Sequence, residues 1–176
     1  MAKRIITISR EFGSGGRFIG EEVAKKLGIA YYDKEMIGQI AEQAGLSSAY
    51  VRENAELSPK KGWFAYAFSG RDITGKSVED MVYEAQRKVI MEIAEKENCV
   101  IVGRNADFIL KDRKDVLNVF IHGSIPEKVR RICSLYNVTE VDAIKMINDI
   151  DKRRRTNYNF YTEQKWGMAE NYTMSL

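Results

Sequence analysis

Residues 8–20 read ISREFGSGGRFIG, and the fold can be worked out most directly from this stretch. It continues the apolar run RIITIS (residues 4–9), so a buried strand enters a glycine-rich turn, after which a helical pattern begins. A turn that opens a helix aims several backbone N–H groups and the positive helix end at one point. The stretch therefore predicts a binding site for an anion such as phosphate. The alternative is a tight turn that needs glycine only for its backbone conformation.

The rest of the chain alternates strand and helix patterns. Short apolar runs predict buried parallel strands at residues 5–9, 29–32, 100–102 and 117–121, and another strand begins in residues 171–176. Apolar spacing predicts helices on the stripe Ile19, Val23 and Leu27, over residues 34–44 and 78–96, after Pro126, and on the stripe Val141, Ile144, Ile147 and Ile150. This alternation predicts a doubly wound α/β sandwich. Because no helix follows the last strand, we expect a C-terminal piece to be missing.

Composition limits the classes of function. With 176 residues, 44% of them apolar, the chain is expected to form one domain. A net charge of +3 argues against nucleic acid as a partner, and no run reaches the roughly 18 apolar residues of a membrane helix. The N-terminal apolar run is too short for a signal peptide, so we expect a cytoplasmic protein. Cys99 and Cys133 match no metal spacing and are predicted to be buried free thiols.

The glycine turn departs from the usual phosphate loop, G-x-x-x-x-G-K-[ST]. Residues 10–17 keep Gly15, but they have Arg10 at the first glycine, Gly16 at the lysine and Arg17 at the hydroxyl residue. Arginine can supply the missing cation, although its planar fork differs from a compact ammonium group. We predict that Arg17 replaces the lysine, and Arg10 is the next candidate.

A dinucleotide-binding fingerprint, G-x-G-x-x-G, is the weaker alternative for the same turn. Gly13 and Gly15 fit it, but Phe18 occupies the third glycine position. Asp33 follows near the position of a ribose-binding acid. Nothing later in the chain supports a nicotinamide site.

A second arginine lies at a predicted strand end. In VIVGRNAD (residues 100–107), Arg104 comes just after a buried strand, at the edge where open α/β sheets bind ligands. This position favours a phosphate clamp. The alternatives are a surface arginine and an ion pair with Asp107.

A third basic cluster, DKRRR (residues 151–155), contains Arg153, Arg154 and Arg155, which cannot all face one way on a helix. Arg155 can pair with Asp151 at i, i+4. The cluster is either a solvated helix end or part of a lid that closes over phosphates. A nucleic-acid patch is a third alternative, against which the net charge and the lack of a basic stripe elsewhere argue.

Together these segments resemble the cytidylate kinase-like family, a branch of the P-loop nucleoside-monophosphate kinases. The resemblance rests on SREFGSGGRFIGEEVAKKLGIAYYDKEMI (residues 9–37), CVIVGRNADFIL (99–110), VFIHGSIPEKVRRI (119–132) and DKRRRTNYNFYT with KWG (151–162 and 165–167). It implies a three-layer α/β/α P-loop fold with a five-stranded parallel sheet. The implied single domain has a core (1–46 and 77–150), a monophosphate-binding insert (47–76) and an arginine-bearing lid (150–167).

The resemblance also implies ATP and Mg²⁺ as cofactors and CMP or dCMP as the acceptor. The implied residues for donor phosphates are Arg10, Gly13, Ser14, Gly15, Gly16 and Arg17; for the acceptor, Asp33, Arg104 and Asp107; and for catalysis, Arg17, Arg104, Arg153 and Arg154. The chain lacks both the loop lysine of cytidylate kinases proper and a Ser or Thr to bind magnesium, so the metal ligands stay open. Two other hypotheses remain: a kinase of another small metabolite, and a regulatory module that binds a nucleotide without turnover.

Overall fold

A computed structural model of the chain describes residues 4–33, 36–45, 48, 51 and 77–176. In this part of the chain five strands form one parallel sheet in the order β2-β3-β1-β4-β5. The strands are β1 (Ile5–Arg10), β2 (Ala30–Tyr32), β3 (Cys99–Val102), β4 (Val116–Ile121) and β5 (Met174–Ser175). All the strands expected from the sequence are present. The central strand is β1, so its carboxyl end, at Arg10, lies in the middle of the sheet edge.

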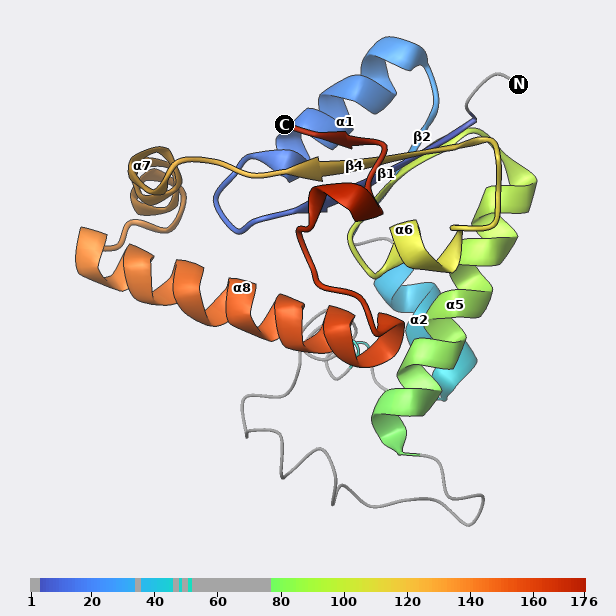
Figure 1. The fold of residues 1–176 in the computed structure, drawn as a ribbon. Coiled ribbons are helices and arrows are strands. Elements are labelled where there is room, and N and C mark those ends of the chain that lie inside the picture. Colours follow the sequence, from blue (N-terminus) through green and yellow to red (C-terminus); the bar gives the residue numbers. More distant parts are fainter. Residues whose placement is uncertain (1–3, 34–35, 46–47, 49–50, 52–76) are drawn as a thin grey trace.

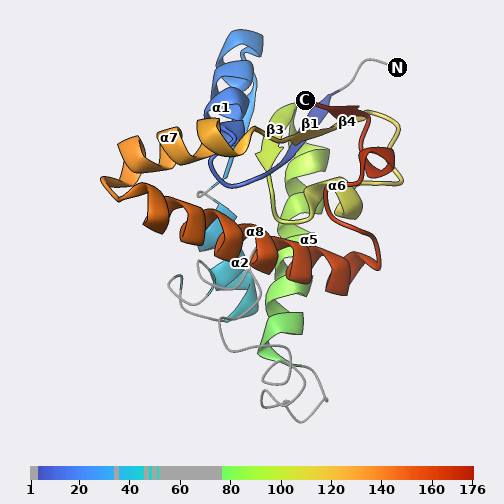
Figure 2. The same ribbon diagram turned by 60° about the vertical axis from the view of Figure 1, so that its left-hand side comes forward.

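Helices cover both faces of the sheet, as predicted. They are α1 (Gly16–Leu27), α2 (Met36–Ala44), α5 (Val78–Lys96), α6 (Ala106–Ile109), α7 (Ile125–Tyr136) and α8 (Glu140–Thr162), with a short 3-10 turn, η1 (Ala169–Asn171), before β5. Figure 1 shows α1 on one side of the sheet and α5, α6 and α8 on the other, and Figure 2 shows the same layers from another side. The sequence did not predict α6. The result is a three-layer α/β/α fold with a five-stranded parallel sheet.

Each face of the sheet has its own apolar core because neighbouring residues on a strand point to opposite sides. Ile5 and Ile101 pack with residues of α2, α5 and α6. Ile8 and Val102 pack with α1 on the other face. The side chain of Arg10 lies on the same face as that of Ile8, toward α1. Because of this alternation, the side chain of Arg10, the last residue of β1, points toward α1.

The face of α1 that meets the sheet is lined mainly by small residues, and of the predicted stripe only Val23 packs against the core there. Ile19 and Leu27 are 43% and 58% exposed, whereas the buried residues of the helix are Gly16, Gly20 and Ala24. A Cβ atom at Gly20 would lie 3.0 Å from Ile8 Cδ1. The helix therefore approaches β1 too closely for larger side chains, and Gly28 ends it in a left-handed conformation as expected.

A second correction concerns the apolar stripe of α8, a single helix of 23 residues that contains both this stripe and most of the expected lid (150–167). Val141 and Ile144, both on the predicted stripe, are exposed, while Ala143 and Ile147 pack against α7. Further along, α8 buries Asp151, Asn157 and Tyr158 against the rest of the protein. The helix thus turns a mainly polar face inward, which apolar spacing cannot reveal.

Some predictions fall on details of burial or outside the described residues. Cys99 is buried and Cys133 is half-buried, and both are free thiols. Of the expected monophosphate-binding insert (47–76), all but Ser48 and Val51 lies outside the described residues. Within the described helices, none has the length and apolar character needed to cross a membrane.

Candidate active site at the glycine turn

The glycine turn (residues 11–16) joins the central strand to α1. Gly13 and Gly15 have φ angles of 84° and 89°, in the left-handed region that favours glycine. The turn is closed by Ser14, whose backbone N–H and hydroxyl both donate to the Glu11 carbonyl oxygen, at 3.3 and 2.9 Å. Gly15 is the N-cap of α1 and provides no capping side chain. The first N–H groups of α1 therefore face the turn, as in an anion-binding nest.

A cavity of about 710 Å³ opens over this turn, at the carboxyl ends of β1 and β3. Its lining includes the side chains of Arg10, Arg17, Arg104, Arg131 and Arg154 and the carboxylates of Glu11, Glu21 and Asp33. The structure thus brings together arginines from β1, α1, the β3–α6 loop, α7 and α8. More cations than carboxylates line the cavity, so it suits an anionic ligand.

Three of these arginines form a buried wall, which we call the three-arginine wall (Arg10, Arg104 and Arg154). Arg10 and Arg104 are each only 5% exposed. All three also line a hollow of about 10 Å³ behind the cavity, bordered by Ser9 and Tyr158. A hollow of this size holds about one water molecule. Because the wall is shielded from solvent, its charges act on an anion in the cavity with little screening.

Arg17 lies elsewhere on the cavity surface, in contact with Asp33. Its Nε atom is 2.6 Å from Asp33 Oδ2, and its side chain is 45% exposed while that of Asp33 is 9% exposed. The Tyr31 hydroxyl donates to the Arg17 carbonyl at 3.2 Å. Burial, and then the charge of Asp33, raises the pKa of Tyr31 to about 12. That Arg17 takes the place of the loop lysine remains a prediction.

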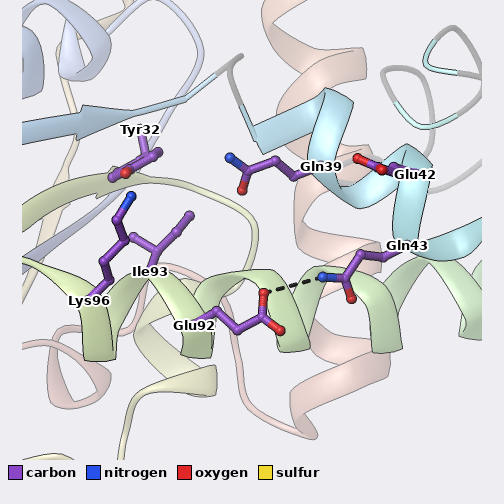
Figure 3. Close-up of a pocket in the computed structure, with 7 residues that line it drawn as sticks. All are labelled: Tyr32, Gln39, Glu42, Gln43, Glu92, Ile93 and Lys96. Carbon is purple, nitrogen blue, oxygen red and sulfur yellow. Dashed lines mark hydrogen bonds between the residues drawn. The ribbon is translucent and has the colours of Figure 1, made fainter.

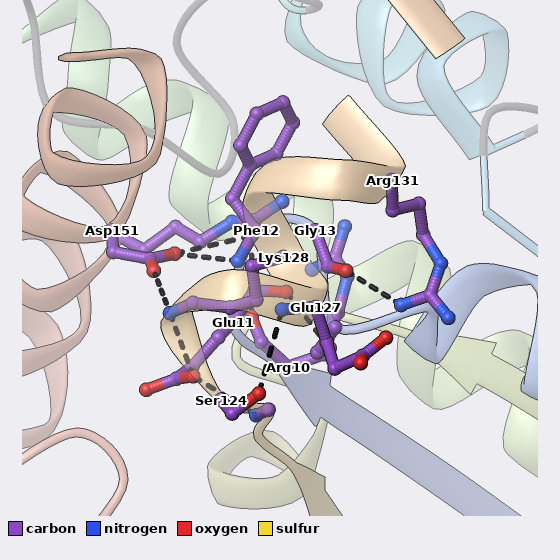
Figure 4. Close-up of polar contacts among 12 residues, drawn as sticks. Arg10, Glu11, Phe12, Gly13, Ser124, Glu127, Lys128, Arg131 and Asp151 are labelled. Atoms are coloured by element: carbon purple, nitrogen blue, oxygen red, sulfur yellow. Dashed lines mark hydrogen bonds and ion pairs between the residues drawn. The ribbon is translucent and has the colours of Figure 1, made fainter. Parts of the chain in front are cut away.

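A buried ion-pair network joins the glycine turn to α7 and α8 (Figure 4). Lys128 Nζ lies 2.9 Å from Glu11 Oε2 and 3.6 Å from Asp151 Oδ2. Glu11 also accepts the Gly123 N–H at 3.2 Å, and Asp151 Oδ1 accepts the Phe12 N–H at 2.7 Å. Burial raises the pKa of Asp151, and the hydrogen bond from Phe12 opposes this effect. The turn is therefore held from outside by side chains as well as by its own hydrogen bonds.

Sequence reasoning missed Lys128 and Arg131, both on α7. Arg131 extends over the glycine turn, and its Nη1 donates to the Gly13 carbonyl oxygen at 2.6 Å (Figure 4). The available signal was their spacing: Lys128 and Arg131 lie three residues apart, on one face of the helix that follows β4. β4 neighbours β1, so the start of α7 lies beside the turn.

The arginines of the third cluster have different surroundings. Arg153 Nη1 lies 4.0 Å from Asp149, and its side chain is 12% exposed. Arg154 Nη1 lies 3.6 Å from Asp151 Oδ1 and donates to the Arg10 carbonyl at 3.2 Å. Arg155 is exposed, with its guanidinium 5.9 Å from the Trp166 ring centroid. The expected pair of Arg155 with Asp151 was wrong, because Asp151 turns toward the glycine turn and Arg154 occupies that side of α8.

Arg104 is held in an unusual backbone conformation. Gly103, Arg104 and Asn105 have φ angles of 72°, 58° and 55° in succession. Gln86 of α5 donates to the Arg104 carbonyl at 2.8 Å, and Asn105 donates to Asn157 of α8 at 3.1 Å. Left-handed residues other than glycine cost about 1–3 kcal/mol and concentrate at functional sites. Two helices thus support the conformation that directs Arg104 into the cavity wall.

Asp107 lies behind the cavity rather than on its lining. It is 3% exposed, and its carboxylate accepts the Ser9 hydroxyl at 3.3 Å and the Tyr158 hydroxyl at 2.7 Å. Burial raises the pKa of Asp107, and these hydrogen bonds partly offset the effect. Burial and the neighbouring Asp107 also raise the pKa of Tyr158. The two oxygens of the Asp107 carboxylate accept hydrogen bonds from Ser9 and Tyr158. These bonds hold the carboxylate in place of the ion pair with Arg104 that the sequence offered as an alternative.

A separate cavity of about 450 Å³ lies between β2, α2 and α5 (Figure 3). Glu42 and Glu92 line it with Lys96 as the one cation among its lining residues, and Gln43 donates to Glu92 at 3.2 Å. Its excess of negative charge is unsuited to a phosphate. The cavity at the glycine turn is therefore the better candidate for the active site.

No dedicated metal cage is present in the described part of the chain, where no three His, Cys, Asp or Glu side chains are grouped for metal binding. The carboxylates of Glu11, Asp33 and Asp151 are each paired with a cation. The donor set fits a Mg²⁺ ion that keeps its waters and is held mainly by phosphate oxygens.

The fold recurs in known structures. A crystal structure of an uncharacterized protein from Eubacterium ventriosum ATCC 27560 has a TM-score of 0.74 and 29% identity, covering 99% of this chain and 87% of that one. Shikimate kinase from Bacteroides thetaiotaomicron has a TM-score of 0.53 and 18% identity, covering 98% of this chain and 84% of that one. Shikimate kinase from Acinetobacter baumannii, in complex with shikimate, has a TM-score of 0.51 and 15% identity, covering 99% of this chain and 83% of that one.

At the level of sequence, no curated protein matches the chain significantly. The sequence profile of the cytidylate kinase-like family, in contrast, matches residues 5–176. This match contains the glycine turn, the three-arginine wall and α8. The chain therefore belongs to the cytidylate kinase-like family.

Proposed function

We propose that this chain is an ATP-dependent phosphotransferase whose acceptor is a nucleoside monophosphate, with CMP or dCMP as the first candidates. The observation that carries the proposal is the three-arginine wall beside the glycine turn, in one cavity of about 710 Å³. A cavity of this size suits a small organic ligand. Buried guanidinium groups recognise phosphate through charge-assisted hydrogen bonds, and they stabilise charge that develops during transfer.

The cavity suggests a division of roles among its residues. The N–H groups at the start of α1 would hold the donor phosphates, with Arg131 above them. Arg104 would bind the acceptor phosphate, and Asp33 would bind the acceptor's polar groups. Asp107 would act from behind the cavity by holding Ser9 and Tyr158, which border the three-arginine wall. Arg154, which lines the cavity, would stabilise the charge that builds between donor and acceptor, and Arg153, next to it on α8, is the second candidate for this role.

The chemistry needs positioning more than covalent participation. A new bond forms between an oxygen of the acceptor phosphate and the γ-phosphorus of ATP, while the bond from that phosphorus to the β–γ bridging oxygen breaks. The products are ADP and a nucleoside diphosphate. Because the acceptor phosphate is already ionised, no side chain has to remove a proton. Mg²⁺, when bound with ATP, supplies further neutralisation of phosphate charge.

A kinase of another small hydroxylated metabolite is the second candidate, and Asp33 is the observation in its favour. Its carboxylate lies on the cavity surface and is 2.6 Å from Arg17. Such a carboxylate can accept the proton of a substrate hydroxyl. In that case Asp33→Asn would abolish transfer, whereas transfer to a monophosphate would tolerate the change better.

The experiment is a coupled assay of ADP release with ATP and Mg²⁺ against a panel of acceptors. The panel contains CMP, dCMP, UMP, AMP, GMP and hydroxylated metabolites such as shikimate, with an assay lacking acceptor as the blank. We expect turnover with a pyrimidine monophosphate. Turnover only with a hydroxylated metabolite would select the second candidate. ATP binding without turnover on any acceptor would favour a nucleotide-binding module.

A further inference from the structure

Two of the positions at which this chain departs from the phosphate-loop pattern, 10 and 16, lie directly beside each other in the structure. The template has glycine at its first position and lysine at its seventh, whereas this chain has Arg10 and Gly16. A Cβ atom at Gly16 would lie 2.6 Å from Arg10 Cβ and 2.9 Å from Arg10 Cγ. Carbon atoms cannot approach so closely, so only one of the two positions can carry a side chain.

The conflict cannot be relieved by a rotation of the Arg10 side chain. The closest atom, at 2.6 Å, is Arg10 Cβ, whose position is set by the backbone and does not change with the side-chain rotamer. That backbone belongs to the central strand, where Arg10 is in register with Ile121 of β4, and its carbonyl accepts a hydrogen bond from Arg154. Position 16 is fixed as well, because it is the first residue of α1, packed on Ile8.

The side chain of Arg10 enters the space that a residue at position 16 would use. It is 5% exposed and lines both the main cavity and the small hollow behind it. Arg17, the other candidate, is 45% exposed and lies 2.6 Å from Asp33. Of the two arginines, Arg10 has the buried position beside the start of α1.

We propose that positions 10 and 16 have exchanged roles: Arg10 supplies the cation of the absent loop lysine to the terminal phosphates of the nucleotide, and residue 16 is glycine to make room for it. This assignment rests on the proposed function, because it presumes a nucleoside triphosphate at the glycine turn. It goes further by naming the residue that distinguishes a triphosphate from a monophosphate. A guanidinium can donate to two phosphate oxygens at once, which a single ammonium does less well.

The test is a double-mutant cycle with Arg10→Gly, Gly16→Lys and the double variant, which restores the usual loop pattern. Thermal unfolding measures the steric part of the proposal without any ligand. Gly16→Lys is expected to lower Tm, and the double variant to recover most of that loss. If the double variant is destabilised by the sum of the two single changes, positions 10 and 16 are independent and the exchange is wrong.

Calorimetric titration with ATP and with AMP measures the ligand part. Arg10→Met keeps the bulk of the side chain without its charge and covers the case in which Arg10→Gly folds poorly. Arg10→Met is expected to weaken the affinity for ATP about ten- to a hundredfold and the affinity for AMP much less. Arg17→Ala is expected to change the two affinities equally. The double variant is expected to regain the preference for ATP.

The results separate this inference from the proposed function. The role given to Arg10 is overturned if Arg10→Met binds ATP with normal affinity. It is also overturned if Arg17→Ala loses affinity for ATP but not for AMP. A wild-type chain that binds neither nucleotide overturns it too. If ATP binds through Arg10 but no acceptor is phosphorylated, only the proposed phosphotransferase activity fails.

Discussion

The backbone N–H of Phe12 donates a 2.7 Å hydrogen bond to the carboxylate of Asp151, 139 residues further along the chain. This bond joins the glycine turn to α8, the helix that carries Arg153 and Arg154. Asp151 also lies 3.6 Å from both Lys128 and Arg154. The turn and Arg154 are therefore positioned by one carboxylate, so a change in one is expected to reach the other.

Lys128→Met is expected to destabilise the protein. The lysine side chain is 4% exposed and lies between Glu11 and Asp151, so its removal leaves Glu11 without this cation and Asp151 with Arg154 alone. Breaking a buried ion pair from one side costs about 3–5 kcal/mol. Urea unfolding measures the change. The control is Lys145→Met, whose pair with Asp142 is exposed and is expected to contribute at most about 1 kcal/mol.

Gly15→Ala is expected to abolish ATP binding, and Gly28→Ala provides a matched control. Both glycines have left-handed backbones, with φ of 89° and 63°, so each alanine costs roughly 1–2 kcal/mol of stability. A Cβ at Gly15 would lie 2.9 Å from Arg131 Nη1 at the cavity, whereas one at Gly28 meets nothing within 4 Å. Calorimetry and thermal unfolding on both variants separate binding from stability. Equal ATP affinity in the two would mean that the glycine turn does not bind phosphate.

Among the arginines of α8, Arg153→Ala and Arg154→Ala are expected to reduce kcat at least about tenfold, with small effects on ATP affinity. A group that meets charge mainly in the transition state affects the rate more than binding. Arg155→Ala is the control, because Arg155 is exposed and lies over Trp166, whereas Arg154 lines the cavity and the side chain of Arg153 is only 12% exposed. Full activity in all three variants would identify the cluster as a solvated helix end.

The buried Asp107 predicts a specific dependence of stability on pH. Burial raises its pKa above the ordinary 3.8, so the folded protein holds the proton more tightly than the unfolded chain. The stabilisation from Asp107 is then present below pH 3.8 and is lost as the pH rises through the raised pKa. Relative to Asp107→Asn, wild-type protein should lose free energy of unfolding over that window, measured by urea unfolding at successive pH values.

Asp115 offers a contrast of opposite sign. Hydrogen bonds from Arg113, at 3.0 and 2.9 Å, lower the pKa of Asp115. The contribution of Asp115 to the free energy of unfolding is therefore present above the ordinary pKa of 3.8, and it is lost as the pH falls through the lowered pKa. Asp115→Asn should show this dependence at the acid end of the same series. A flat difference between wild type and Asp107→Asn would contradict the shift assigned to Asp107.

Local patterns in the sequence were sufficient for the strands, for the helices other than α6, and for the position of the glycine turn. Apolar runs located the strands, and the periodicity of residues 78–96 predicted α5 with the bounds Val78–Lys96 that the structure has. The glycines of residues 13–16 predicted the turn, and the resemblance to cytidylate kinase-like proteins predicted the family. These features depend on a residue's nearest neighbours in the chain, which the sequence contains directly.

The tertiary structure alone decided how the site is assembled. The contact of Arg10 with Gly16 depends on how closely α1 packs on β1, and the roles of Lys128 and Arg131 depend on where α7 starts beside the glycine turn. The bond from Phe12 to Asp151 depends on the rotation of α8, whose inward face is polar. Residues far apart in sequence meet through strand order and helix packing, and apolar spacing carries little information about polar groups that are buried by pairing.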